Sequence, residues 1–335
     1  MSDPPADPFG ERVRGTKRWH CRLLGADFEF ETDHRAVKRL VQQAFEGLPA
    51  YRLKPETPKL KVRIVLRHRA SRQRGVPPRP RFAGGADIVT ATIDADNYAV
   101  LAPRQGSALL VFSSDMLRHS YYLRYELLEF AVITLAVRAL GLVPLHAACV
   151  SLNGRGVLLV GKSGSGKSTL SLNAAASGLA LVAEDNLFVE PRRLRSASIP
   201  NYLYVRSDTP RRLLTPGLAR ALARAPLIRR RSGVRKRALD LRHAGLAVGR
   251  RAPRIVAMVL LSPRPAGAGQ HLVRRAAGRA VARLRAMQAY ATTRAQWPRF
   301  ARMISQLPCY ELRRGAHPAE TVAALKALLR SRARR

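Results

Sequence analysis

The chain reads Gly161-Lys162-Ser163-Gly164-Ser165-Gly166-Lys167-Ser168-Thr169 near its middle, which is the complete G-x-x-x-x-G-K-[ST] pattern of a phosphate-binding loop. An apolar run of strand length, 157–160, precedes it, and small, helix-tolerant residues follow at 170–176. Strand, glycine loop and helix is the order that such a loop requires. The stretch therefore predicts an α/β fold with nucleotide chemistry at the loop.

Each residue type in the loop has a physical reason. The glycines allow backbone conformations that a Cβ would forbid, so successive N–H groups can converge on phosphate oxygens at a helix N-terminus. Lys167 can reach the β and γ phosphates as a point charge, and the Ser168 hydroxyl can bind Mg²⁺. We expect an ATP site made by Gly161, Ser163, Gly164, Ser165, Gly166, Lys167, Ser168 and Thr169.

Charge is the second unusual feature of this 335-residue chain. Its formal net charge is +38, and most of the excess is arginine in the C-terminal half. Such a field attracts nucleic acid, anionic lipid or an acidic protein or peptide. The alternative is that arginine has replaced lysine over the whole surface without a specific partner. Charge alone therefore leaves the partner open.

Composition also bears on the class of protein. An apolar content of 47% is enough for a core, and three distant cysteines without C-x-x-C spacing predict neither a zinc site nor a disulfide framework. The longest apolar run, 130–137, is too short to span a bilayer, and the polar N-terminus has no apolar signal core. We expect a cytoplasmic protein without a membrane span.

The chain divides by pattern into three parts. Residues 1–15 are predicted to be a flexible tail, 16–115 a smaller α+β module, and 116–335 the P-loop catalytic domain. In the module, alternating apolar residues predict a helix over 36–46, a loop over 71–81 and strands over 27–32, 60–67, 87–94, 98–102 and 109–113.

In the catalytic domain, Asn153-Gly154 predicts a tight hairpin that leads into the loop. A linking helix is expected over 120–140, and the arginine-rich block 210–251 as helix and loop. The other expected elements are the hairpin strands 148–152 and 155–160, strands over 179–183, 254–262 and 309–312, and helices over 276–294 and 318–329.

Phosphoryl transfer needs a carboxylate near Mg²⁺ and, for a hydroxyl acceptor, a base. Glu184 and Asp185 follow the 179–183 strand, so they would emerge beside the phosphates on a neighbouring strand end, whereas the strand at 254–262 ends without a carboxylate. The pair is the best Walker-B-like candidate, the alternative being an ordinary acidic exit from a strand. A histidine such as His146, between Leu145 and Ala147, is by itself more often a buried, hydrogen-bonded core residue, and only its position relative to the loop favours a role in the site.

Three features together resemble the HPr kinase/phosphorylase superfamily, in its divergent HPr-kinase-related serine kinase branch, whose core is related to phosphoenolpyruvate carboxykinase. They are Leu145-His146-Ala147-Ala148, the hairpin into the loop, and Glu184-Asp185. Segments 23–28, 307–312 and 317–318 are also similar to that branch. The resemblance implies a mixed sheet with flanking helices and an Mg-ATP-dependent kinase that acts on a serine or threonine of a small protein or peptide.

The resemblance also implies residue roles. Glu184 would be the base, Asp185 would bind the metal with Ser168, and His146 would lie beside the γ phosphate with Lys167. Glu184 departs from the family's usual aspartate by one methylene. The glycine-rich signature of bona fide HPr kinases is not visible in 200–250, which argues against HPr as acceptor. A further cation for the transition state is expected from the arginine-rich block, which offers Arg206, Arg235 and Arg237 among many others.

Two other hypotheses stay open. The +38 charge favours a nucleic-acid-associated P-loop ATPase, against which stands the lack of a helicase motif series, an ABC-type signature or an aromatic–basic stacking pattern. A nucleotide-sensing regulator without kinase activity would follow if Glu184 has lost base function. The expected partner is a small protein or peptide, for which an acidic character would suit the charge, and a homo-oligomer is also left open.

Overall fold

The computed structural model describes residues 17–68, 75–162, 164–210, 214–267, 270–315 and 317–331. The chain forms two compact units. The first runs to Ala139 but excludes Arg22–Gly25 and Gly47–Thr57, which belong with Leu140–Arg335 in the second. The long helical segment before Leu140 thus groups with the first unit, beyond the border expected near residue 115. No described helix is both long and apolar enough to cross a membrane.

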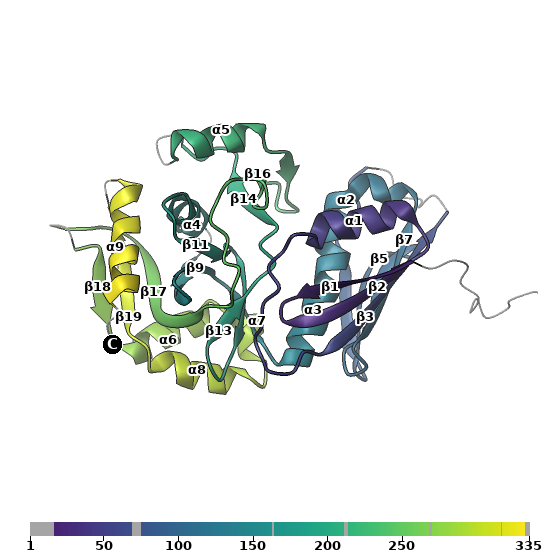
Figure 1. The fold of residues 1–335 in the computed structure, drawn as a ribbon, viewed down its shortest axis with the longest axis horizontal. Coiled ribbons are helices and arrows are strands. Elements are labelled where there is room, and N and C mark those ends of the chain that lie inside the picture. The colour runs from purple at the N-terminus through teal and green to yellow at the C-terminus, as the bar shows by residue number, and fades with distance from the viewer. Residues whose placement is uncertain are drawn as a thin grey trace, which may run out of the picture. The chain divides into compact units, whose positions relative to one another are not determined.

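The first unit is built on a seven-stranded mixed sheet with the order β1-β2-β3-β7-β6-β5-β4 (Figure 1). In β2 the residues alternate, with Phe28 and Phe30 buried and the acidic residues between them half-exposed, which is the period of a strand with one covered face. The strands are β1 Lys17–Leu23, β2 Ala26–Thr32, β3 Lys59–Arg67, β4 Arg81–Gly85, β5 Ile88–Asp94, β6 Asn97–Ala102 and β7 Ser107–Ser113.

The strands expected in this unit are confirmed to within one or two residues, but β1 and β4 were missed. Every residue of β4 is exposed, and two of its five residues are glycine, so it carries no apolar alternation. β1 is largely polar. Of the loop expected over 71–81, residues 71–74 lie outside the described residues, and Arg81 already belongs to β4.

Helix α1, Arg35–Phe45, buries the apolar face that its sequence predicts: Val37, Leu40, Val41, Ala44 and Phe45. The helix expected over 120–140 exists as three consecutive segments: α2 Ser120–Tyr122, the π-helix η2 Leu123–Leu128 and α3 Glu129–Leu140. The 3₁₀ helix η1 Asp115–His119 directly precedes them. A buried ion pair between Arg124 Nη1 and Glu129 Oε1, 2.5 Å apart, joins η2 to α3.

The second unit contains a nine-stranded sheet with the order β11-β9-β10-β17-β13-β12-β8, to which β19 adds on β17 and β18 on β19. The predicted hairpin is confirmed, and Asn153 and Gly154 both have a positive φ, 51° and 76°. The strands are β8 Val143–His146, β9 Ala148–Leu152, β10 Arg155–Val160, β11 Ala180–Ala183, β12 Asn186–Glu190, β13 Arg195–Ala197, β17 Arg254–Pro265, β18 Leu272–Arg275 and β19 Cys309–Arg314.

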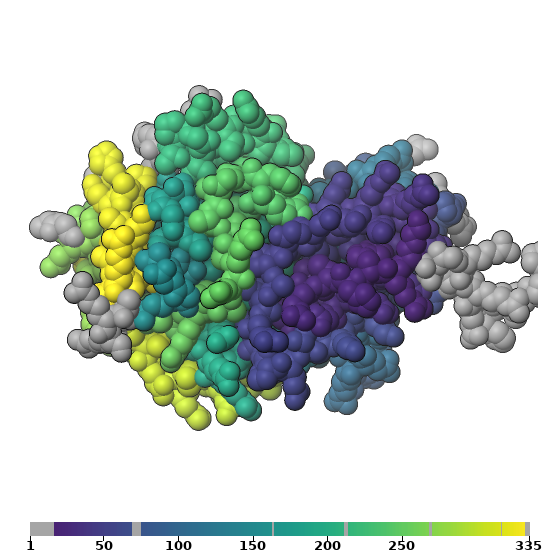
Figure 2. All heavy atoms as spheres, in the orientation of Figure 1, coloured from purple at the N-terminus to yellow at the C-terminus, as the bar shows by residue number. Residues whose placement is uncertain are grey.

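Helices cover both faces of this sheet (Figure 1). Alternate residues of β10 serve two cores: Val157 and Leu159 pack with residues of α4 and α9, and Leu158 and Val160 with residues of α6 and α8. Both views show α9 beside α4, and in Figure 2 α9 is the yellow surface next to the teal one. The helices are α4 Lys167–Ala176, α5 Pro216–Arg224, α6 Ala277–Ala286, α7 Ala289–Thr292, α8 Trp297–Ser305 and α9 Pro318–Ser331.

Two expectations in this unit were wrong in part. The block 210–251 contains, besides α5, the strands β15 Leu227–Arg229 and β16 Arg235–Asp240, which form a separate three-stranded sheet with β14 Tyr202–Arg206. The basic start of β16 hides its strand pattern. The helix expected over 276–294 is broken between α6 and α7, at Met287 and Gln288. Both differences bring residues to the site described next.

Candidate phosphoryl-transfer site

The glycine loop has the backbone that an anion cradle requires. Gly164 and Gly166 have φ of 80° and 92°, a region that favours glycine, and α4 begins directly after Gly166. A Cβ on Gly161 would meet Ser165 Oγ and would lie within 3.2 Å of Leu261 Cβ, so a larger residue there would displace its neighbours. Ser163, expected in the site, lies outside the described residues. The loop is thus shaped by its glycines.

Two polar groups of the loop suit a phosphate. Ser165 Oγ is buried without a hydrogen-bond partner among the described residues. Lys167 Nζ donates to Gly161 O at 2.7 Å and to Lys162 O at 3.3 Å, which holds the ammonium over the loop. Burial lowers the pKa of Lys167, although Asp185 and Glu184 oppose the shift. A buried ammonium and an unsatisfied hydroxyl are groups that anionic oxygens would satisfy.

The two carboxylates lie at the same edge of the sheet as the loop. β10 and β11 both run antiparallel to β9, so their carboxyl ends share one edge, with β9 between them rather than as direct neighbours. Glu184 and Asp185 are the two residues that connect β11 to β12. The sequence therefore predicted the edge correctly.

The two carboxylates have different side-chain partners. The Ser168 hydroxyl donates to Glu184 Oε1. His146 Nδ1 lies 2.8 Å from Asp185 Oδ1, with 39% and 30% of the two side chains exposed. Ser168 and His146 are thus each paired with one carboxylate, and Lys167 acts on both carboxylates through its charge.

Electrostatics push the pKa values of the two carboxyls apart. Burial and the neighbouring charge of Asp185 raise the pKa of Glu184, against the hydrogen bond from Ser168 and the charges of Lys236 and Arg230. Burial would also raise the pKa of Asp185, but the hydrogen bond and charge of His146, with Lys236 and Lys167, outweigh it and hold that pKa below its usual value. At neutral pH Asp185 is therefore an ionised carboxylate.

The sequence missed three residues near this pair. Lys236, on β16, acts electrostatically on Lys167, Glu184 and Asp185. Gln288 hydrogen-bonds the backbone of His146, and Tyr290, half-exposed on α7, lies within electrostatic range of Asp185. For Gln288 and Tyr290, the signal would have been an end of the helix at Met287-Gln288, but the sequence pattern predicts one basic helix over 276–294.

Two of the arginines expected to supply a second cation have partners of their own, Arg206 in the pocket described below. Arg206 forms an ion pair with Asp208 at 2.6 Å, and Arg237 Nη1 donates to Ala225 O at 2.9 Å. For Arg235 no side-chain contact to the site is described. Lys236, between the last two in sequence, is a cation besides Lys167 whose charge acts on both carboxylates.

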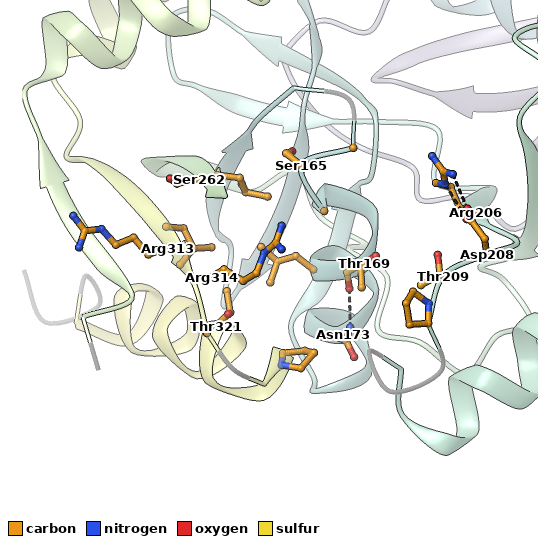
Figure 3. Close-up of a pocket in the computed structure, with 18 residues that line it drawn as sticks. Ser165, Thr169, Asn173, Arg206, Asp208, Thr209, Ser262, Arg313, Arg314 and Thr321 are labelled. Atoms are coloured by element: carbon orange, nitrogen blue, oxygen red, sulfur yellow. Dashed lines mark hydrogen bonds and ion pairs between the residues drawn. The ribbon is translucent and has the colours of Figure 1, made fainter. Parts of the chain in front are cut away.

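A pocket of about 630 Å³ adjoins the loop on the side of α4 and α9 (Figure 3). Thr169 and Asn173 of α4 line one side, and Arg314, from the end of β19, extends toward them, whereas Arg313 points away. Its volume falls within the usual range of small-molecule sites. A nucleoside would fit next to the phosphate loop.

Within the described part of the chain, no three His, Cys, Asp or Glu side chains form a metal-ligand group. A hydroxyl, one or two carboxylates, phosphate oxygens and water are, however, a donor set that Mg²⁺ uses. Ser168 and Glu184 provide the first two of these donors. The residues present thus fit a magnesium ion bound together with a nucleotide.

Comparisons with known proteins give a distant match. No protein-family profile matches the chain, and no curated protein matches it. Among the solved structures that match is the HPr(Ser) kinase/phosphatase from Coxiella burnetii, with 14% identity, 57% of this chain and 90% of that chain covered, and a TM-score of 0.30. At so low a TM-score the likeness decides neither the fold nor the activity of this chain.

Proposed function

We propose that this protein is an Mg-ATP-dependent phosphotransferase that phosphorylates a serine or threonine hydroxyl on a small protein or peptide. The observation that carries the proposal is the convergence of Lys167 and Ser168 with Glu184 and with Asp185 paired to His146. A phosphate loop alone would serve any nucleotide-binding protein. A second, ionised carboxylate oriented by a histidine is what a hydroxyl acceptor additionally needs.

The contacts support the opposite division of labour from the one that the resemblance implies. Glu184 accepts a hydrogen bond from Ser168, the P-loop hydroxyl, so we assign Ser168 and Glu184 to Mg²⁺. Asp185 is ionised and is held by His146, so we assign Asp185 as the base that takes the acceptor's proton. In this assignment the longer side chain of Glu184 binds the metal, and the base is the aspartate at 185.

ATP held by the loop would supply the γ-phosphoryl group, and Mg²⁺ bound with it would neutralise charge on the phosphates. The residues of the chain do the rest. Asp185 accepts the proton of the acceptor hydroxyl while the oxygen of that hydroxyl bonds to the γ phosphorus. At the same time the bond between the γ phosphorus and the bridging oxygen breaks, and ADP leaves with that oxygen. Lys167 and Lys236 stabilise the negative charge that develops.

The test is transfer of labelled γ-phosphate from Mg-ATP to small proteins and peptides encoded beside this chain. We expect label on serine or threonine in the wild type, and a loss of at least 100-fold in Lys167→Ala, Glu184→Gln and Asp185→Asn. Glu184→Gln should also raise the Mg²⁺ concentration needed for half-maximal rate, whereas Asp185→Asn should not. A raised Mg²⁺ requirement in Asp185→Asn but not in Glu184→Gln would instead support the roles that the resemblance implies, with Asp185 at the metal and Glu184 as the base.

Two outcomes would contradict the proposal. ATP hydrolysis that rises on adding RNA or DNA, without transfer to protein, would indicate the nucleic-acid-associated ATPase. Nucleotide binding without either transfer or hydrolysis would indicate the regulator.

A further inference from the structure

His146 lies at an edge of the nine-stranded sheet, where the side chain of another residue takes the place of a further strand. Within the described residues, β8 is the last strand in the sheet order, and its only strand partner is β12, with His146 opposite Asn186. The next residue, Ala147, donates its N–H to Asp185 O at 3.1 Å. On the outer side, the backbone groups of His146 need partners that a further strand would otherwise supply.

Gln288 supplies both partners. Its Oε1 accepts from His146 N at 2.8 Å, and its Nε2 donates to His146 O at 3.1 Å, across 142 positions of sequence. The side chain is 1% exposed. A carboxamide carries a donor and an acceptor on one carbon, as a peptide group does, so Gln288 takes the place of one residue of a neighbouring strand.

The backbone of Gln288 is itself held firmly. It lies between α6 and α7, where Gln288 N donates to Arg285 O at 3.1 Å and Gln288 O accepts from Ala291 N at 2.9 Å and Thr292 N at 3.1 Å. The amide is therefore presented from a fixed point, and the Cα of His146 is fixed with it. The imidazole that orients Asp185 extends from that Cα.

We infer that Gln288 is a positioning residue for phosphoryl transfer, which holds the His146–Asp185 pair in the geometry that lets Asp185 accept a proton. The inference rests on the proposed function. Loss of the amide would remove a hydrogen-bond partner from the part-buried N–H and from the part-buried C=O of His146, and the Tyr290 phenol, which also hydrogen-bonds that backbone, could not replace both. The end of β8 would therefore shift to regain partners. A shift of about 1 Å at a catalytic group can reduce a rate by about 100-fold.

Other charged groups face the same pair and must stay unchanged in a test. Asp185 is faced by Glu184 from its own connection, Lys167 from α4 and Lys236 from β16. From α7, Tyr290 approaches with a phenol whose pKa burial and Asp185 raise to about 12, so it stays neutral. None of these contacts Gln288 in the described hydrogen bonds, so a change at 288 acts through His146.

The first experiment compares Gln288→Leu, which removes both hydrogen bonds, with Gln296→Leu, which removes a carboxamide in the same part of the chain that lies against Gly141 and has no described hydrogen bond to His146. We expect kcat for Mg-ATP turnover, by transfer or hydrolysis, to fall about 10- to 100-fold in Gln288→Leu. KM for Mg-ATP should change less than about twofold, because the loop is untouched. Equal kcat values in the two variants would overturn the inference.

A second variant separates positioning from folding. Gln288→Glu has the same shape, and its carboxyl can donate to His146 O only when protonated. We expect its rate relative to the wild type to rise as pH falls, toward recovery, whereas a variant that is merely less stable would lose further activity. A ratio that stays flat or falls toward acid pH would count against the proposal.

A spectroscopic measurement keeps the two proposals distinguishable. In protein with ¹⁵N-labelled histidine, we expect a hydrogen-bonded His146 Nδ1–H signal, assigned with His146→Asn, that is broadened or lost in Gln288→Leu but not in Gln296→Leu. A wild type without transfer or hydrolysis would defeat the proposed function alone. An unchanged His146 signal in Gln288→Leu would defeat the positioning role alone.

Discussion

At the scale of single residues, the site depends on two adjacent carboxyls in different surroundings. Glu184 and Asp185 are neighbours in sequence, but one is bonded to a hydroxyl and the other to an imidazole. Their pKa values consequently move in opposite directions. Groups whose environments separate their pKa values in this way are typical of acid–base sites.

The raised pKa of Glu184 predicts a stability effect with a definite sign. A folded pKa above the unfolded value contributes stability that is present below the unfolded pKa and is lost as pH rises through the folded pKa. Glu184→Gln should therefore be more stable than the wild type at neutral pH without Mg²⁺ and nucleotide, and the difference should vanish in acid. Thermal unfolding over a pH series measures it; a gain of about 1 kcal/mol would raise Tm by roughly 2–4 °C.

Asp185→Asn is the matched comparison, since its pKa is lowered instead. That variant should lose stability above the unfolded pKa, with the loss disappearing as pH falls through the folded pKa. Two variants that shift Tm in the same direction at neutral pH would contradict the separation of the two pKa values.

At the scale of elements, the β9–β10 hairpin sets where the phosphate loop begins. Asn153 and Gly154 turn the chain with positive φ at both positions, and the register pairs Arg155 with Leu152. Because strand residues alternate between two faces, a slip of one residue would exchange the two cores that β10 serves. The turn therefore fixes which side chains of β10 lie under α4.

The hairpin predicts a backbone cost at Gly154. Gly154→Ala should destabilise the protein by about 1–2 kcal/mol through its φ of 76°, although an added Cβ there meets nothing within 4 Å. Gly217→Ala is the control, because it also meets nothing within 4 Å but lies in α5, where alanine stabilises a helix. Urea unfolding of both variants measures the difference, and equal midpoints would contradict the prediction.

At the scale of the whole molecule, the second unit is not continuous in sequence. Residues 22–25 and 47–57 belong to it, although the chain between and after them belongs to the first unit. Tyr51 is 1% exposed, and its hydroxyl donates to Gly249 O at 2.9 Å. A fragment cut at residue 116 or 140 would lack these parts of its own unit.

This organisation predicts that Tyr51→Phe weakens the second unit. The change keeps the ring but leaves the carbonyl of Gly249 without this donor, at a cost of about 1–3 kcal/mol. Urea titrations in which the folding of the loop region is monitored by its protection with bound nucleotide would measure this loss of stability. Tyr98→Phe in the first unit is the control. Unfolding of the loop region at the same midpoint in all three proteins would contradict the prediction.

Local pattern was enough for elements whose signal lies in their own residues. The buried face of α1, the Asn153-Gly154 turn and the strand–loop–helix order at 157–176 all followed from the period of apolar residues and from the need for glycine. Strands β4 and β16 were missed because they are exposed or basic, so their pairing depends on neighbours rather than on their own alternation.

The glycine loop, its hairpin and a carboxylate pair at the end of a following strand were predictable from the sequence alone, because the glycines and the apolar periods that mark these elements lie in their own residues. Only the tertiary structure decided which carboxylate meets Ser168, that Lys236 rather than a named arginine acts on the pair, and that Gln288 holds His146. Those contacts join residues far apart in the chain, and their geometry depends on packing that no local period encodes.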